Sequence, residues 1–119
     1  MRLNEIQFNG APPIDSYGPG GFRIAGNWID GSLILLPSGI HAIKDLTLAE
    51  VSPLVDAGAQ IDVVLIGQGS EIGPLAPEIR NAIEASGPGA EVMSTPSACR
   101  TYNVLLAEDR RVAAILTAV

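Results

Sequence analysis

Cysteine and histidine are almost absent from this 119-residue sequence, which contains one of each, Cys99 and His41. A single cysteine cannot form an internal disulfide, and with one histidine it leaves too few ligands for a Cys/His metal site. Residues 1–20 also lack the charged start, apolar centre and cleavage site of a signal peptide. We therefore expect a protein of a reducing compartment, the cytoplasm, with no metal site and no cofactor.

Basic residues are scarce as well. The chain has seven lysines and arginines against thirteen acidic residues, a formal net charge of −6, and Arg110-Arg111 is its one adjacent basic pair. Proteins that bind nucleic acid need clustered Lys and Arg to neutralise phosphates, so this class is disfavoured. Apolar runs are short, far below the roughly 20 residues that span a bilayer, so we expect a chain that does not span the membrane.

The composition that remains is that of a folded domain. Hydrophobic residues make up 47% of the chain and charged residues 17%, which excludes an intrinsically disordered protein. The length is typical of one domain, and neither a repeat nor a linker divides the sequence. We therefore treat residues 1–119 as a single domain.

The first half of the chain has the patterns of short strands. Residues 3–8 alternate and predict a strand with Ile6 and Phe8 inward, whereas the glycines and prolines of 9–20 predict a loop. Asp30-Gly31 between two apolar runs predicts a hairpin turn. The predicted strands around and after this turn cover residues 22–29, 32–36 and 39–43.

The second half alternates between helical and strand patterns. Thr47 and Glu50 have the spacing of a capping box, and Pro53 should end that helix early. The unbroken apolar run of residues 62–66 predicts a strand covered on both faces, the most buried of the sheet. Thr95 should cap a helix over residues 96–108. With a helix around residues 79–86 and strands at 90–93 and 112–116, these crossovers predict a mixed, partly parallel sheet.

Two glycine-rich segments come near to known phosphate motifs. Gly67-Gln68-Gly69 follows the buried strand, but Gly73 comes one residue too late for a dinucleotide fingerprint. The segment could hold an anion at a helix N-terminus, or it could be a tight turn. Residues 17–21 lack the lysine and hydroxyl of a Walker motif, which favours a structural turn or a close backbone approach.

The start of the third helix carries the remaining candidates. A helix N-terminus and the neighbouring Arg100 would both lower the pKa of Cys99, as in a nucleophile or redox sensor, although free cysteine is most often buried filler. Arg100 and Asn103 share a helix face that is either functional or simply solvated. No residue set identifies a catalytic centre. If strands 62–66 and 90–93 are parallel, their ends bring together one candidate binding surface: Gly67, Gln68, Gly69, Cys99, Arg100 and Asn103.

Several segments together resemble a known family, that of mitochondrial complex I assembly factor 3 and the adipogenesis-associated Mth-domain proteins, with many bacterial members. The similarity covers roughly residues 5–118 and is most specific at Cys99 to Asn103. The chain departs from the family at Gln68, where threonine is usual, and around His41. The segments that carry the resemblance are Tyr17 to Ile24, Gly31-Ser32, Leu35 to Pro37, Leu65 to Gly69, Glu91 to Thr95, Ala98 to Asn103 and Arg111 to Ala114.

The resemblance implies a compact three-layer α/β domain around the mixed sheet, with about three helices and N-terminal β-hairpins. It also implies a non-enzymatic protein-interaction module that acts as an assembly factor for a respiratory membrane complex. The partner would be a subunit of that complex or part of its assembly machinery. The alternative is a small-molecule or anion binding protein, or an enzyme, that uses the 67–69 loop and the start of the 96–108 helix.

Overall fold

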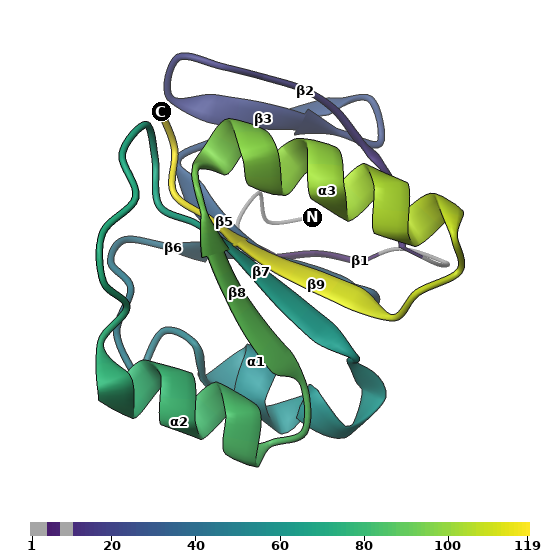
Figure 1. Ribbon diagram of the computed structural model, residues 1–119. Helices are drawn as coiled ribbons and strands as arrows, with labels where there is room; N and C mark the ends of the chain where they lie inside the picture. The colour runs from purple at the N-terminus through teal and green to yellow at the C-terminus, as the bar shows by residue number, and fades with distance from the viewer. Residues whose placement is uncertain (1–4, 8–10) are drawn as a thin grey trace.

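The computed structural model describes residues 5–7 and 11–119, with the backbone alone for residues 5–7. The inward positions predicted for Ile6 and Phe8 lie outside what is described. The chain forms nine strands, three α-helices and one short 3-10 helix in this part (Figure 1). In chain order they are β1 (Glu5–Gln7), β2 (Ile14–Gly18), β3 (Gly21–Ile24), β4 (Asn27–Asp30), β5 (Ser32–Leu36), β6 (Gly39–Ile43), α1 (Ser52–Asp56), η1 (Gly58–Gln60), β7 (Val63–Gly67), α2 (Pro77–Ala85), β8 (Gly89–Met93), α3 (Thr95–Ala107) and β9 (Val112–Leu116).

Two sheets organise these elements. Six strands form one sheet in the order β1-β6-β5-β9-β7-β8, and β2, β3 and β4 form an antiparallel sheet of their own. In the large sheet β7 runs parallel to β8 and β9, whereas β5 pairs antiparallel with β6 and β9. The predicted mixed, partly parallel sheet is confirmed.

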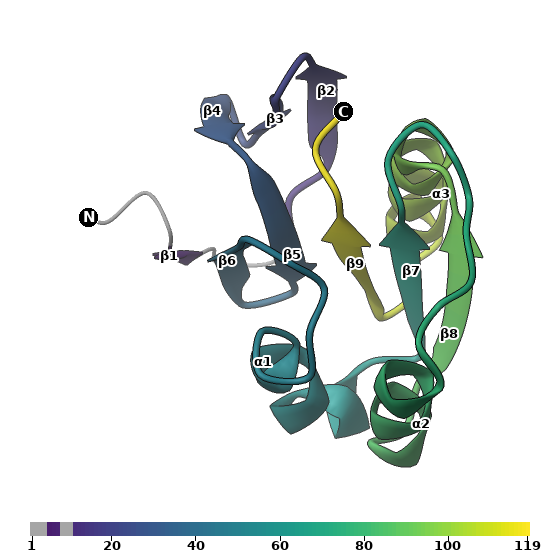
Figure 2. The same ribbon diagram turned by 90° about the vertical axis from the view of Figure 1, so that its left-hand side faces the viewer.

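The large sheet is the middle of three layers (Figure 2). Helices α1 and α2 cover one face, and α3 with the small sheet covers the other. Strand β9 shows the alternation: Ala113 and Ile115 pack towards α2, while Ala114 and Leu116 pack towards α3. All five β9 residues are buried, but Val63 of β7 is half-buried. The most buried strand is thus β9 rather than β7, because β9 lies at the centre of the sheet.

The small sheet contradicts two predictions. Residues 9–20 are not all loop, because Ile14–Gly18 forms β2 and pairs with β3 through a bulge. The hairpin turn lies at Ala25-Gly26, both with positive φ (52° and 79°), rather than at Asp30-Gly31. Gly31 (φ 88°) instead turns the chain from β4 into β5, which belongs to the other sheet. A turn residue shows where the chain changes direction, but not whether the flanking strands pair.

A turn and a close backbone approach account for the glycines of residues 17–21, as the sequence indicates: Gly20 has a φ of 81°, and Gly21 leaves no room for a side chain. A Cβ atom on Gly21 would lie 2.4 Å from the Ile29 carbonyl oxygen and 2.8 Å from the Trp28 ring. A Cβ on Gly18 would touch the same ring at 3.4 Å. Gly21 therefore lets the Trp28 indole pack against the backbone of the small sheet, and Gly18 lies in ordinary contact with the same ring.

The first helix also differs from its prediction. The Thr47 Oγ1 does accept from the Glu50 amide (3.2 Å), but the Glu50 carboxylate accepts from the Lys44 amide (2.9 Å) instead of closing the capping box. These contacts stabilise the turn before the helix. Helix α1 then begins at Ser52 with Pro53 in its first turn, where a missing N–H costs no helical hydrogen bond. None of the helices in the described ranges is long and apolar enough to cross a membrane.

Candidate functional site

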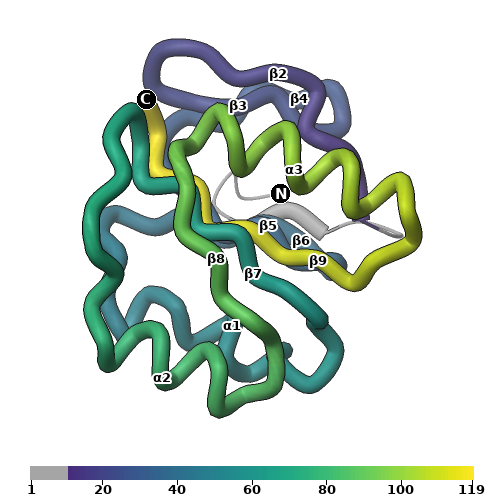
Figure 3. Tube along the Cα trace, in the orientation of Figure 1, coloured from purple at the N-terminus to yellow at the C-terminus, as the bar shows by residue number. Residues whose placement is uncertain are grey.

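Three neighbouring strand ends meet at one edge of the large sheet. Gly67 at the end of β7 is in register with Met93 of β8 and with Leu116 of β9. The loop after β7, the start of α3 and the C-terminal tail therefore lie together (Figure 3). The Gln68 amide donates to the Met93 carbonyl at 2.9 Å, and the Thr117 amide donates to the Gly67 carbonyl at 2.9 Å. The structure thus places the 67–69 loop beside the start of α3.

Thr95 connects all three segments. It is completely buried, and its Oγ1 accepts from the Gly69 amide (2.8 Å) and donates to the Thr117 carbonyl (2.7 Å). Its own amide donates to the Gly69 carbonyl at 2.8 Å. Thr95 is therefore not the predicted cap; the cap of α3 is Ser94, whose Oγ accepts from the Ser97 amide at 3.3 Å. Either hydroxyl suits a cap by sequence, and the buried neighbours of Thr95 decide between them.

The same contacts occupy the N-terminal turn of α3. The Thr95 amide is bonded to Gly69, Pro96 has no N–H, and the Ser97 and Ala98 amides both donate to Ser94. The predicted anion site required free backbone amides in this turn. These amides donate hydrogen bonds within the protein instead. The start of α3 is bound to its own sheet rather than open to a ligand.

Packing explains the glycine pattern of the 67–69 loop. A Cβ on Gly67 would lie 2.9 Å from the Thr95 Cα and 3.1 Å from the Ala98 Cβ, so only glycine allows α3 to approach this closely. Gly69 has a φ of 86°, which glycine adopts readily. The Gln68 Oε1 accepts from the Gly73 amide at 2.7 Å and closes the following loop. The turn interpretation of this segment accounts for all three residues.

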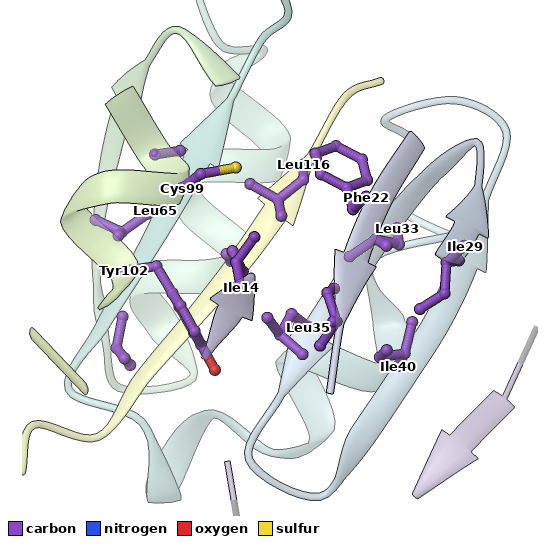
Figure 4. Close-up of a cluster of buried hydrophobic side chains, with 14 residues drawn as sticks. Ile14, Phe22, Ile29, Leu33, Leu35, Ile40, Leu65, Cys99, Tyr102 and Leu116 are labelled. Carbon is purple, nitrogen blue, oxygen red and sulfur yellow. The ribbon is translucent and has the colours of Figure 1, made fainter. Parts of the chain in front are cut away.

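Cys99 lies in the core between α3 and the sheet (Figure 4). Its side chain is 4% exposed and belongs to the same cluster as Leu65, Tyr102 and Leu116. Burial raises the pKa of the Cys99 thiol from 9.0 to about 11, and the charge of Arg100 opposes this only in part. The thiol is therefore protonated near neutral pH, unlike an activated nucleophile.

This burial gives a testable result for Cys99. Because the folded-state pKa is raised, the protein should lose stability as the pH rises from about 9 to about 11, where the unfolded chain releases the proton first. Burial raises the pKa of Tyr102 as well, so its effect has the same sign at higher pH. Urea unfolding across this pH range should show that the free energy of unfolding falls less steeply with pH for Cys99→Ala than for the wild type. At pH 8 iodoacetamide should alkylate the thiol only in urea; rapid labelling of the folded protein would contradict the buried position.

The side chains of Arg100 and Asn103 make different contacts, although the two residues are three apart on one helix. The Arg100 side chain is exposed and donates to the Ser97 Oγ at 3.3 Å. The Asn103 amide group clamps the backbone of β2: its Oδ1 accepts from the Ile14 N–H and its Nδ2 donates to the Ile14 carbonyl, both at 2.8 Å. Beside it, the Tyr102 hydroxyl donates to the Pro12 carbonyl at 3.1 Å. Of the six candidate residues, Arg100 is the one whose charged group faces solvent.

The structure also shows an open depression that the sequence analysis did not identify. It has a volume of about 630 Å³ and lies between β6 and the segment leading into α1. Glu50 and Pro53 belong to patterns that predict a helix start and its end, but no sequence pattern connects them with the β6 residues of the lining. Within residues 5–7 and 11–119, no three His, Cys, Asp or Glu side chains gather as a metal site would require. The depression is lined by His41, Ala42, Ile43, Lys44, Ala49, Glu50, Ser52 and Pro53.

Several known proteins are similar to this chain in sequence. A protein of Rhodobacter capsulatus is 44% identical over 98% of this chain and 92% of its own length. Mouse NADH dehydrogenase [ubiquinone] 1 alpha subcomplex assembly factor 3 is 34% identical over 98% of this chain. This alignment spans 65% of the mouse protein, somewhat less than two thirds of its length.

A solved structure has the same fold. The crystal structure of an outer membrane protein from Bartonella henselae superposes with a TM-score of 0.88 at 46% identity, covering 94% of this chain and 98% of the other. The family model described as a protein of unknown function, DUF498/DUF598, matches residues 14–117. This match spans most of the chain, from β2 to the end of β9. The chain therefore belongs to the DUF498/DUF598 family and is homologous to the complex I assembly factors 3.

Proposed function

We propose that this protein is a protein-binding module that assists the assembly of a respiratory membrane complex related to NADH dehydrogenase. The observation that carries the proposal is the similarity to assembly factor 3, which extends over 98% of this chain. A match of this extent includes all three layers of the fold.

The geometry of the predicted site argues against catalysis by its residues. The Cys99 thiol is buried and protonated, the Gln68 side chain closes its own loop, and the Asn103 side chain holds β2. The alternative of an anion site at the start of α3 loses its physical basis, because the first-turn amides are bonded within the protein. What the fold presents to a partner is therefore its outer surface, which includes the edge strand β8 of the large sheet.

A deletion strain of the source organism tests the proposal. Deleting the gene should reduce the amount of fully assembled NADH dehydrogenase on native gels, and a plasmid copy of the wild-type gene should restore it. Succinate dehydrogenase, measured on the same gels, is the control for a general loss of membrane protein. A tagged copy should also retain a subunit of the complex, or a protein bound to it, after mild cross-linking. Unchanged assembly in the deletion strain, with no such protein retained, would refute the proposal.

A further inference from the structure

Strand β8 leaves one edge of the large sheet open. It is the last strand in the order β1-β6-β5-β9-β7-β8, and in Figure 1 this edge faces the viewer between α3 and α2. The Gly89 amide donates to the Asp62 carbonyl (3.1 Å), and the Met93 carbonyl accepts from the Gln68 amide (2.9 Å). Residues 89, 91 and 93 therefore direct their backbone groups towards β7. In a parallel pair the intervening residues, Ala90 and Val92, direct theirs outward.

One contact confirms this direction independently. The Arg80 guanidinium of α2 reaches over the edge and donates to the Ala90 carbonyl at 3.0 Å. By the register of the strand, the Ala90 N–H and both backbone groups of Val92 remain for an added strand. The segment 89–93 contains no proline, no lysine and no bulge, the devices with which sheet edges usually prevent pairing. In the described ranges no helix or strand covers this edge, and the Arg80 side chain reaches over it at Ala90.

From this we infer that β8 binds an extended, basic segment of the protein partner as an additional strand of the sheet. The inference rests on the proposed function and specifies how the partner binds. Extended segments commonly bind to open sheet edges in this way, through backbone hydrogen bonds.

The charges around the edge determine the kind of segment. Glu91 of β8 and Glu84 of α2 are both exposed, and the one nearby cation on α2, Arg80, lies 3.8 Å from the Glu84 carboxylate. The whole chain carries a net charge of −6. A lysine or arginine side chain opposite Glu91 on the added strand would therefore face a carboxylate. A second copy suits the edge poorly, because a two-fold antiparallel pairing about Glu91 would place two carboxylates opposite each other.

Synthetic peptides test the inference without the natural partner. The probe is a capped seven-residue peptide of alternating lysine and valine, and its counterpart has glutamate in place of lysine. Titrated into ¹⁵N-labelled protein, the basic peptide should shift the Ala90 and Val92 amide resonances and slow their hydrogen exchange. The acidic peptide should do neither. Absence of protection at both amides with the basic peptide would overturn the inference, and protection by self-association without peptide would identify a second copy as the occupant.

Two variants separate backbone pairing from charge. Val92→Pro removes an outward N–H and no bond to β7, a position where a sheet tolerates proline, and should weaken peptide binding at least about fivefold. Glu91→Lys leaves the backbone intact and should weaken it about two- to fivefold. Asp45→Lys makes the same change in net charge on an exposed residue after β6 and should leave binding unchanged. Equal loss in both charge variants would show that only net charge matters.

The deletion strain distinguishes a failure of this inference from a failure of the proposed function. If wild type restores complex assembly and a folded Val92→Pro protein does not, both stand. If both proteins restore it, the assembly role stands and the β8 edge is not the binding site. If wild type itself has no effect on assembly, the proposed function fails, while the peptide titration still reports on the edge.

Discussion

Replacing Thr95 with valine is expected to lower the free energy of unfolding by about 2–5 kcal/mol, although the two side chains have nearly the same shape. Valine lacks the hydroxyl that accepts from the Gly69 amide and donates to the Thr117 carbonyl. The bond to Gly69 is buried and the bond to Thr117 is partly buried, so both backbone groups would lose their partner and the Gly69 amide would also be cut off from water. Each such group costs about 1–3 kcal/mol.

The matched control is Thr95→Ser, which keeps the hydroxyl and loses one buried methyl group. It should cost about 1 kcal/mol, the value of the lost apolar contact. Urea unfolding followed by circular dichroism measures both variants. If Thr95→Val were destabilised no more than Thr95→Ser, the two hydrogen bonds would not be needed for stability. Hydrogen exchange at Gly69 should accelerate in the valine variant alone, since its amide loses the acceptor.

Replacing Asn103 with alanine is expected to destabilise the protein by about 1–3 kcal/mol and to loosen β2 from α3. The Asn103 side chain makes two hydrogen bonds to Ile14, which is distant in sequence and buried in the core. Removing it leaves the Ile14 N–H and carbonyl at a partly buried position without these partners. Exchange of the Ile14 amide should accelerate more than exchange in β7.

Arg100→Ala is the control for this variant, because Arg100 is exposed on the same helix and its side chain donates a hydrogen bond to Ser97 one turn away. Its effect on stability should stay within about 0.5 kcal/mol. Equal stability in the two variants, combined with loss of partner binding in Asn103→Ala, would show that Asn103 belongs to a binding surface. The expected order of stability is wild type, Arg100→Ala and then Asn103→Ala, with a clear step between the last two.

The most regular segments could be predicted almost to the residue. The apolar run after Asp62 forms β7, and the last predicted strand coincides with β9 at Val112–Leu116. The helix predicted over residues 96–108 coincides with α3 to within one residue at each end, and its Ala98 and Tyr102 are completely buried. Their patterns are local: a strand between two layers has an unbroken apolar run, and a helix on a sheet has a stripe with a 3.6-residue period.

The small sheet was harder to predict because its strands are short and its glycines serve the packing. Gly21 is required by the Ile29 carbonyl and the Trp28 ring beside it, but in the sequence the glycines of this segment indicate a loop. Ala25-Gly26 is a weak hairpin pattern, yet it forms the turn, whereas the stronger Asp30-Gly31 pattern connects two sheets. Pairing depends on which strands the core brings together, and this is not a local property.

The candidate site shows the same division between local and tertiary causes. The sequence by itself determined that the 67–69 turn follows a buried strand and that a helix begins near Thr95, because turn and cap chemistry act over a few residues. Only the tertiary structure decided what those residues do. The Thr95 hydroxyl bonds to Gly69 and Thr117, and the Asn103 amide bonds to Ile14. It also decided that β8 is the edge strand, because strand order depends on long-range pairing and not on the sequence of the strand. Folding brings each polar side chain next to residues that are distant in sequence. Those neighbours decide whether the side chain is available to bind a ligand or holds the structure together.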